Sequence, residues 1–333
     1  MEIREPEMVK LSKNEKHMSL LKQILKFIGV YIGLTIVTII VTLILGILLG
    51  IVSGIVIAII SNNTMGSYEL LSKFTNLILS PRAESFITLY GTIVTLIITI
   101  LYCKFLEKRS LRSIGFQKKN FFKHYLIGLL IGGFMIFIAI LINFLVGSIK
   151  IEGISEGFNG TTLFLIIAYF IGFVFQGASE EILFRGFFMI DIGAKHKIVT
   201  AIIVSSLIFS LAHVFNPGIT ISELISLFLL GVFLSLYIIC FDNIWGACAI
   251  HTMWNFIQVN IFGINTDLLK ISDSIFKTTE ITSTSSLHII DDLTGIAFFV
   301  IAICLLLLYM KKHGKFTLST FSSNENEQNV TTK

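Results

Sequence analysis

Two adjacent carboxylates and a guanidinium interrupt an apolar run of the chain, in the stretch GASEEILFRGFF. These groups belong to Glu180, Glu181 and Arg185. Charged side chains are costly at membrane depth, and there they usually face a protein interior or a water-filled cavity where they serve a function. A carboxylate in such a place can take a proton from water, which is how hydrolysis of a peptide bond begins. The stretch therefore predicts hydrolytic chemistry inside an apolar protein.

Two further apolar stretches each place a histidine four residues from a second side chain. FSLAH carries Phe209 and His213, and HTMWN carries His251 and Asn255. Residues four apart share one face of a helix. Peptide hydrolysis needs a base for water, donors for the oxyanion and exclusion of bulk water. We predict Glu180 as the base and His213 as the group that shares or orients the water. His251 and Asn255 are predicted to direct two donors at the oxyanion.

The neighbours of these residues are assigned supporting roles. Glu181 and Arg185 are four apart and can pair along one helix face, while Glu180 points about 100° away. We predict that the pair positions the site, and a direct role for Glu181 stays open. Phe209 is expected to form a packing wall above the water, and Gly186 to permit close approach of another element.

The composition indicates whether the chain folds in water or in a membrane. Of 333 residues, 54% are hydrophobic and 14% charged, and the mean hydropathy is +0.87. These values favour an all-α polytopic membrane protein, whose partners are the lipid bilayer and a peptide or membrane-protein substrate. The formal net charge of +4 is small, and the Lys and Arg residues cluster in particular loops, so no nucleic-acid binding is expected. The four cysteines have no metal-binding spacing.

Eight segments are apolar and long enough to be candidate transmembrane helices. They lie at about 27–60, 86–103, 125–146, 161–189, 198–215, 222–241, 244–262 and 295–310. The first would extend about 51 Å at 1.5 Å per residue, so it must tilt or project from a core of about 30 Å. Ionisable groups occur centrally in the fourth, fifth and seventh spans and not in the first three or the last. These three helices are therefore predicted to form the active-site bundle.

Counting from the turns predicts the depth of the site. Glu180 lies 17 residues before Lys197 and His213 lies 16 after it, which places the two at one depth in a helical hairpin. His251 lies close to the next turn, near Asp242, and the mismatch in depth is about 13 Å. The hairpin must therefore project beyond the membrane on the cytoplasmic side, or the helices must tilt strongly.

The three stretches together resemble a known family. EEILFR, FSLAH and HTMWN are similar to the motifs Glu-Glu-x-x-x-Arg, Phe-x-x-x-His and His-x-x-x-Asn of the CPBP (Abi) family of intramembrane proteases. That family includes the CAAX-processing endopeptidases and bacteriocin-associated proteins. The motifs match in order across roughly 165–262. The resemblance implies an eight-helix bundle, an intramembrane endopeptidase, and His251 with Asn255 at the oxyanion.

The resemblance and the loop charges together divide the chain. Basic residues before the first span and after the second predict that both regions are cytoplasmic, and eight spans then place both termini inside, in a bacterial cytoplasmic membrane. The predicted parts are a basic N-terminal segment (1–26), three spans (27–158), a CAAX-protease-like catalytic core (159–262), an external loop (263–294), a last span (295–310) and a cytoplasmic tail (311–333).

Two alternatives stay open at this stage. Zinc is the alternative to a metal-independent glutamate mechanism, and its ligands would be Glu180, His213 and His251. The sequence contains no His-Glu-x-x-His motif, which favours the glutamate mechanism without a cofactor. The alternative to an enzyme is a non-catalytic bacteriocin-immunity or membrane scaffold protein. A transporter would require broken helices in two related halves, and no proline lies within a span.

Overall fold

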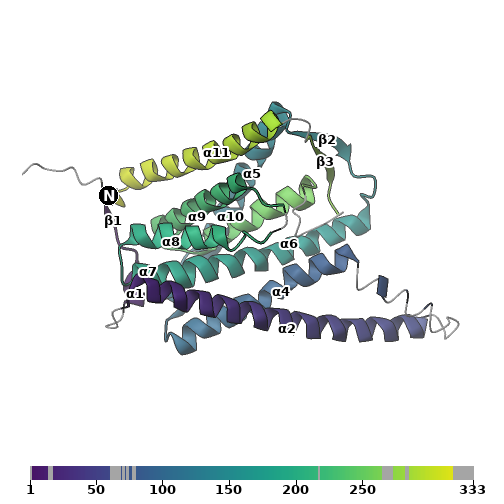
Figure 1. Cartoon of the computed structure of the whole chain (residues 1–333), viewed down its shortest axis with the longest axis horizontal. Helices are drawn as coiled ribbons and strands as arrows, with labels where there is room; N and C mark the ends of the chain where they lie inside the picture. Colours follow the sequence, from purple (N-terminus) through teal and green to yellow (C-terminus); the bar gives the residue numbers. More distant parts are fainter. Residues whose placement is uncertain are drawn as a thin grey trace, which may run out of the picture.

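The computed structural model describes residues 2–13, 18–60, 80–216, 218–264, 273–281 and 285–317, with isolated positions at 69, 72, 75 and 76. This part of the chain is mainly helical (Figure 1). Its long helices are α2 (Leu20–Ile60), α4 (Pro81–Leu101), α5 (Phe121–Val146), α6 (Gly160–Glu181), α8 (Ile198–Leu211), α9 (Ile221–Phe241), α10 (Trp245–Phe256) and α11 (Ser285–Lys312). The all-α membrane fold is therefore as predicted.

Shorter elements extend or connect these helices. The π-helical turns are η1 (Tyr102–Leu106) after α4, η3 (Ile182–Met189) after α6 and η4 (Ile257–Ile261) after α10. The other short elements are α1 (Glu7–Ser12), the 3-10 helix η2 (Leu111–Ile114), α7 (Ile190–Gly193), β1 (Glu2–Ile3), β2 (Ile149–Ile154), β3 (Phe276–Glu280) and β4 (Phe316–Thr317).

All eight predicted spans coincide with helices in the described part of the chain. Six of the helical runs there are long and apolar enough to cross a membrane. The fifth and seventh predicted spans are shorter: α8 has 14 residues and α10 has 12 before η4. A helix of 14 residues rises about 21 Å, less than the bilayer core of about 30 Å. The first and last helices begin earlier than predicted, at Leu20 and Ser285.

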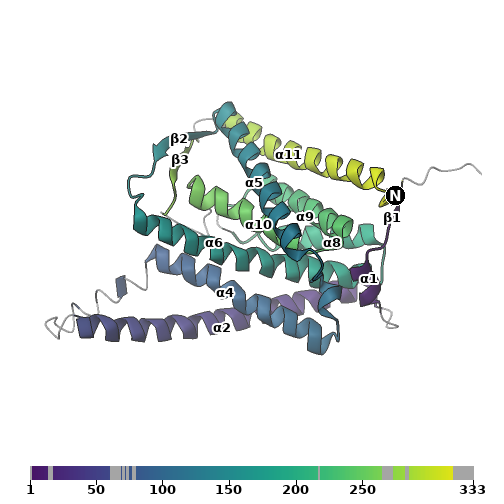
Figure 2. The ribbon, with the colours of Figure 1, turned by 180° about the vertical axis from the view of Figure 1, so that it is seen from behind.

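Helix α6 runs through the middle of the molecule. Figure 1 and Figure 2 show α4 and then α2 on one side of it, and α10, α5 and α9 on the other, with α11 at the far edge. Helix α2 is held to α4 by a hydrogen bond of 2.8 Å between the Thr38 and Thr95 hydroxyls. Most of its other large apolar side chains are exposed, as expected for a helix that faces lipid.

The N-terminal segment, predicted only as a basic region, is docked against the bundle. Met8 and Val9 of α1 are buried, and the Asp242 carboxylate accepts hydrogen bonds from the backbone amides of Glu7 and Met8. This carboxylate satisfies amides at the start of α1 that have no partner within the helix. Strand β1 pairs antiparallel with β4, so the two ends of the described chain lie on the same side of the molecule.

The described ends of the predicted external loop also form regular contacts. Strand β3 pairs antiparallel with β2, and Arg82 at the start of α4 forms a two-pronged ion pair with Asp273, at 2.8 and 2.7 Å. Residues 265–272 and 282–284 of that loop, and the tail from 318 to 333, lie outside the described residues.

Helix α5 packs on α10 through a Gly-x-x-x-Gly pair, Gly128 and Gly132. A Cβ atom on Gly132 would lie 2.5 Å from the Ile250 carbonyl oxygen, one residue before His251. Small residues of this kind let two membrane helices approach closely. The pair therefore sets the position of the helix that carries His251.

We expect Gly132→Ala to lower the free energy of unfolding by about 1–3 kcal/mol, the usual cost of overpacking, because its Cβ meets backbone that cannot move aside. Thermal unfolding of the purified protein in lipid measures the effect. Gly133→Ala is the matched control, since a Cβ there would lie 3.5 Å from the Ile257 and Met253 side chains, an ordinary contact. Equal stability of the two variants would contradict the prediction.

Candidate active site

Glu181 lies at the centre of a buried polar cluster. Its Oε1 atom accepts hydrogen bonds from Arg185 Nη1 at 3.0 Å and from His251 Nδ1 at 2.9 Å. The Glu181 and Arg185 side chains are both fully buried. The pairing that the four-residue spacing predicts is therefore present, and it also reaches across to α10. One oxygen of Glu181 thus orients both a guanidinium and an imidazole.

Close contact between α6 and α10 makes this cross-helix bond possible. A Cβ atom on Gly177, one turn before Glu181, would lie 3.0 Å from the Thr252 amide nitrogen and 3.1 Å from the Cys248 carbonyl. No side chain fits there, so the two backbones meet one turn from the cluster. The helix changes to the π-helical turn η3 directly after Glu181. Such turns are frequent at functional sites because they redirect side chains.

Glu180 has a different environment from Glu181. Its Oε1 accepts a hydrogen bond from the Gln176 side-chain Nε2, and the side-chain oxygen Oε1 of Gln176 accepts one from Asn255 Nδ2 at 2.9 Å. Its Oε2 has no hydrogen-bond partner among the described residues and lies 3.7 Å from His251 Nε2. The Glu180 side chain is 24% exposed and that of Glu181 is 0% exposed. Glu181 Oε2 also has no hydrogen-bond partner among the described residues, so the difference between the two carboxylates is that Glu180 is the more accessible one.

Phe209 forms one wall of the cluster. Its ring centroid lies 4.1 Å from the Arg185 guanidinium carbon, a cation–π contact, and 6.3 Å from the ring centroid of His251. An aromatic face stabilises a buried guanidinium beyond what its ion pair supplies. The predicted packing role thus extends to holding Arg185 in place.

His213 lies next to Phe209, with ring centroids 4.9 Å apart. Its Nδ1 donates to the Phe209 carbonyl oxygen at 2.8 Å, and it makes no hydrogen bond to either glutamate among the described residues. The structure thus joins Glu181 and His251 by a direct hydrogen bond and places Glu180 Oε2 3.7 Å from His251 Nε2. Asn255 is linked to Glu180 through Gln176, and the His213 ring lies against the Phe209 ring.

Gly186 lies where the helix that carries the first motif passes the start of α10. A Cβ atom on Gly186 would lie 2.8 Å from the Ile114 carbonyl oxygen and 3.2 Å from the Ile244 side chain, next to the start of α10. Residues 187–197 therefore extend past the start of α10. Helix α1 packs against this extension, where Val9 lies against Gly193. Gly186 therefore permits the close approach of another element that was predicted for it.

Sequence reasoning missed Gln176. This side chain connects Glu180 with Asn255, which lie on different helices. A signal for it exists, because Gln176 is a polar residue four positions before Glu180 in an apolar helix and so shares its face.

The zinc alternative would require Glu180, His213 and His251 to converge on one point. No three His, Cys, Asp or Glu side chains gather into a metal site within the part of the chain that the structure describes. Of the three ligands considered, Glu180 and His251 are neighbours, whereas His213 is bonded to a backbone carbonyl. A catalytic zinc site needs three protein ligands around one point.

Fold and site together define a polytopic helical membrane protein with a carboxylate–imidazole–guanidinium cluster among its helices. Residues 161–257 match the family model described as Rce1-like, type II CAAX prenyl endopeptidase. This segment contains all three motifs, so the resemblance predicted from them is confirmed there. The segment that holds the site is thus similar to the membrane-embedded CAAX proteases. Comparison with curated proteins and with solved structures finds no significant match.

Proposed function

We propose that this protein is an intramembrane endopeptidase that hydrolyses a peptide bond of a membrane-associated protein or peptide with water activated by Glu180. The observation that carries the proposal is the pair formed by Glu180 Oε2 and His251 Nε2. These atoms are 3.7 Å apart, and the carboxylate oxygen has no other partner among the described residues. A separation of this size is too long for a direct hydrogen bond, and a water beside the two atoms is placed to contact both.

The reaction follows from the roles of these groups. Glu180 takes a proton from the water while the water oxygen adds to the substrate carbonyl carbon. Glu180 then gives this proton to the amine nitrogen when the C–N bond breaks. His251 is held by its Nδ1–H on Glu181, and in its doubly protonated form it also carries a proton on Nε2, which donates to the developing oxyanion. Asn255, one turn away, releases Gln176 and supplies the second donor. The surrounding helices exclude bulk water.

A comparison of membrane proteomes tests this function and identifies the substrate. Membranes that contain the active protein are compared with membranes that contain Glu180→Gln, and new peptide ends are sought. We expect at least one membrane protein to be cut only with the active form. The competing immunity or scaffold function requires no base, so a biological effect that Glu180→Gln preserves in full would favour a binder.

We further propose that the reaction needs no metal. The support is the poor fit of His213 to a shared ligand set with Glu180 and His251. Stoichiometric zinc in the purified protein, together with loss of cleavage on its removal and recovery on its return, would contradict this proposal.

We propose that the protein lies in a bacterial membrane and that both of its termini are cytoplasmic. Basic residues gather near them and in the loop after α4, among them Lys10, Lys22, Lys108, Lys118, Lys119 and Lys312. Positively charged segments next to membrane helices are usually retained in the cytoplasm. A reporter fused after Lys315 is therefore expected to read cytoplasmic, and one inserted between 282 and 284 external. The reverse pattern would refute this orientation.

A further inference from the structure

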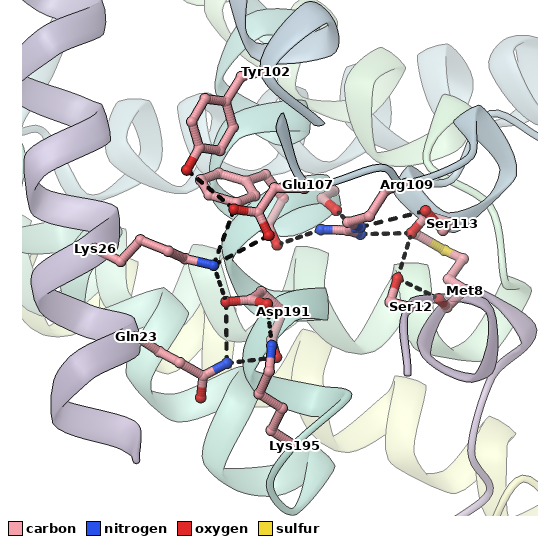
Figure 3. Close-up of polar contacts among 12 residues, drawn as sticks. Met8, Ser12, Gln23, Lys26, Tyr102, Glu107, Arg109, Ser113, Asp191 and Lys195 are labelled. Carbon is pink, nitrogen blue, oxygen red and sulfur yellow. Dashed lines mark hydrogen bonds and ion pairs between the residues drawn. The ribbon is translucent and has the colours of Figure 1, made fainter. Parts of the chain in front are cut away.

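Figure 3 shows a second polar cluster, at the ends of α2, η1 and α7. Lys26 Nζ lies 2.9 Å from Asp191 Oδ2 and 3.3 Å from Glu107 Oε1. Lys195 Nζ lies 2.7 Å from Asp191 Oδ1, and Gln23 donates to the Asp191 backbone and side chain. The charges of these lysines and acids are compensated by opposite charges.

Arg109 lies beside this cluster and differs from its lysines in having no carboxylate partner among the described residues. It forms no ion pair with a carboxylate among the described residues, although its side chain is buried. Its donors go to neutral oxygens: Nη1 to the Phe187 carbonyl at 3.1 Å, and Nη2 to the Gly186 and Ser113 carbonyls at 2.8 and 2.9 Å. Burial lowers the pKa of this guanidinium from its usual value. A buried charge of this kind is costly unless its hydrogen bonds are needed.

The two carbonyls on η3 belong to the segment that carries the site. Gly186 directly follows Arg185, and the π-helical turn starts one residue after Glu181. A π-helical turn holds one more residue than an α-helical turn. Its conversion to regular helix would rotate the residues on one side of it by about 100° relative to those on the other. Groups that fix this turn therefore fix how Arg185 faces Glu181.

We propose that Arg109 is a positioning residue, which holds the η3 turn through the Gly186 and Phe187 carbonyls and thereby keeps Arg185, Glu181 and His251 in register. The inference deepens the proposed function and rests on it for its catalytic part. Its structural part stands on the fork of hydrogen bonds from Arg109. A planar guanidinium can serve two successive carbonyls at once, and a lysine ammonium provides only a point charge.

Hydrogen exchange tests the structural part without any substrate. Arg109→Met and Arg109→Lys are compared with the intact protein in lipid, over peptides that cover residues 182–193. We expect exchange there to become at least about tenfold faster in Arg109→Met and less so in Arg109→Lys, because local opening follows lost hydrogen bonds. Arg112→Met is the control, since that arginine is 60% exposed and forms an ion pair with Glu7 on the surface. Unchanged exchange in both Arg109 variants overturns the inference, whatever the protein hydrolyses.

Kinetics on the cleaved segment found by the proteomic comparison test the catalytic part. With protein that is folded, we expect Arg109→Met to lower kcat by about 10- to 100-fold and to leave KM within about threefold, since a displacement near 1 Å is enough for such a loss. Arg109→Lys should recover part of kcat. A normal kcat in the folded Arg109→Met protein overturns the inference alone. Absence of cleavage by the intact protein instead defeats the proposed function, and the catalytic part of the inference with it.

Discussion

Glu180→Gln is expected to lower the turnover number by about 10²–10⁴-fold, the usual contribution of general acid–base catalysis, and to leave the protein folded. The substitution preserves the shape of the side chain, and an amide oxygen can still accept the hydrogen bond from Gln176. It removes the basic oxygen that faces His251 across 3.7 Å. Stability should change little, because this carboxylate has no ion pair with a Lys or Arg among the described residues and its side chain is partly exposed.

The measurement is cleavage of the identified substrate segment, alongside thermal unfolding. Glu84→Gln is a suitable control, because Glu84 is an exposed carboxylate in the first turn of α4. Retention of more than a tenth of the normal turnover by Glu180→Gln would show that another group activates the water.

Glu181→Gln is expected to reduce stability as well as activity. It leaves Arg185 as a fully buried guanidinium without its carboxylate, and removal of one partner of a buried pair typically costs about 3–5 kcal/mol. The contact with the Phe209 ring remains and offsets only part of this loss. Activity falls too, because the amide no longer presents a charged acceptor to His251 Nδ1.

The double variant Glu181→Gln with Arg185→Met separates the two effects. Both charges are then absent, so the free energy of unfolding should recover most of what Glu181→Gln lost, while cleavage stays low. The checks are thermal unfolding and cleavage on the single and double variants side by side. If Glu180→Gln were the unstable variant and Glu181→Gln the stable but inactive one, the roles of the two glutamates would be reversed.

Local spacing predicted one part of the site and not the rest. The Glu181–Arg185 pair was predictable because residues four apart on a helix lie side by side. The hydrogen bond from His251 to Glu181 was not predictable, because it joins residues 70 positions apart and requires a glycine at Gly177, where a side chain would keep the two helices apart. The bridge through Gln176 joins helices for the same kind of reason. Helix periodicity describes one element at a time and carries no information on which faces of two elements meet.

The same distinction applies to the fold. Continuous apolar runs predicted the helices, since backbone groups in a bilayer must be paired within the segment. The docking of α1 was not predicted, because Met8 and Val9 are short apolar interruptions in a polar segment, and their partners lie far along the chain. The π-helical turn η3 was also beyond prediction, since it depends on tertiary contacts such as those made by Arg109.

The pairing of β1 with β4 can form only late in the synthesis of the chain. Glu2 and Ile3 leave the ribosome long before their pairing partners, Thr317 and Phe316. The Asp242 carboxylate that caps α1 also arrives late. Strand β1 must therefore stay unpaired until β4 has been made. A chain released before Asp242 and β4 have been made would leave the segment that contains β1 and α1 without both of these partners.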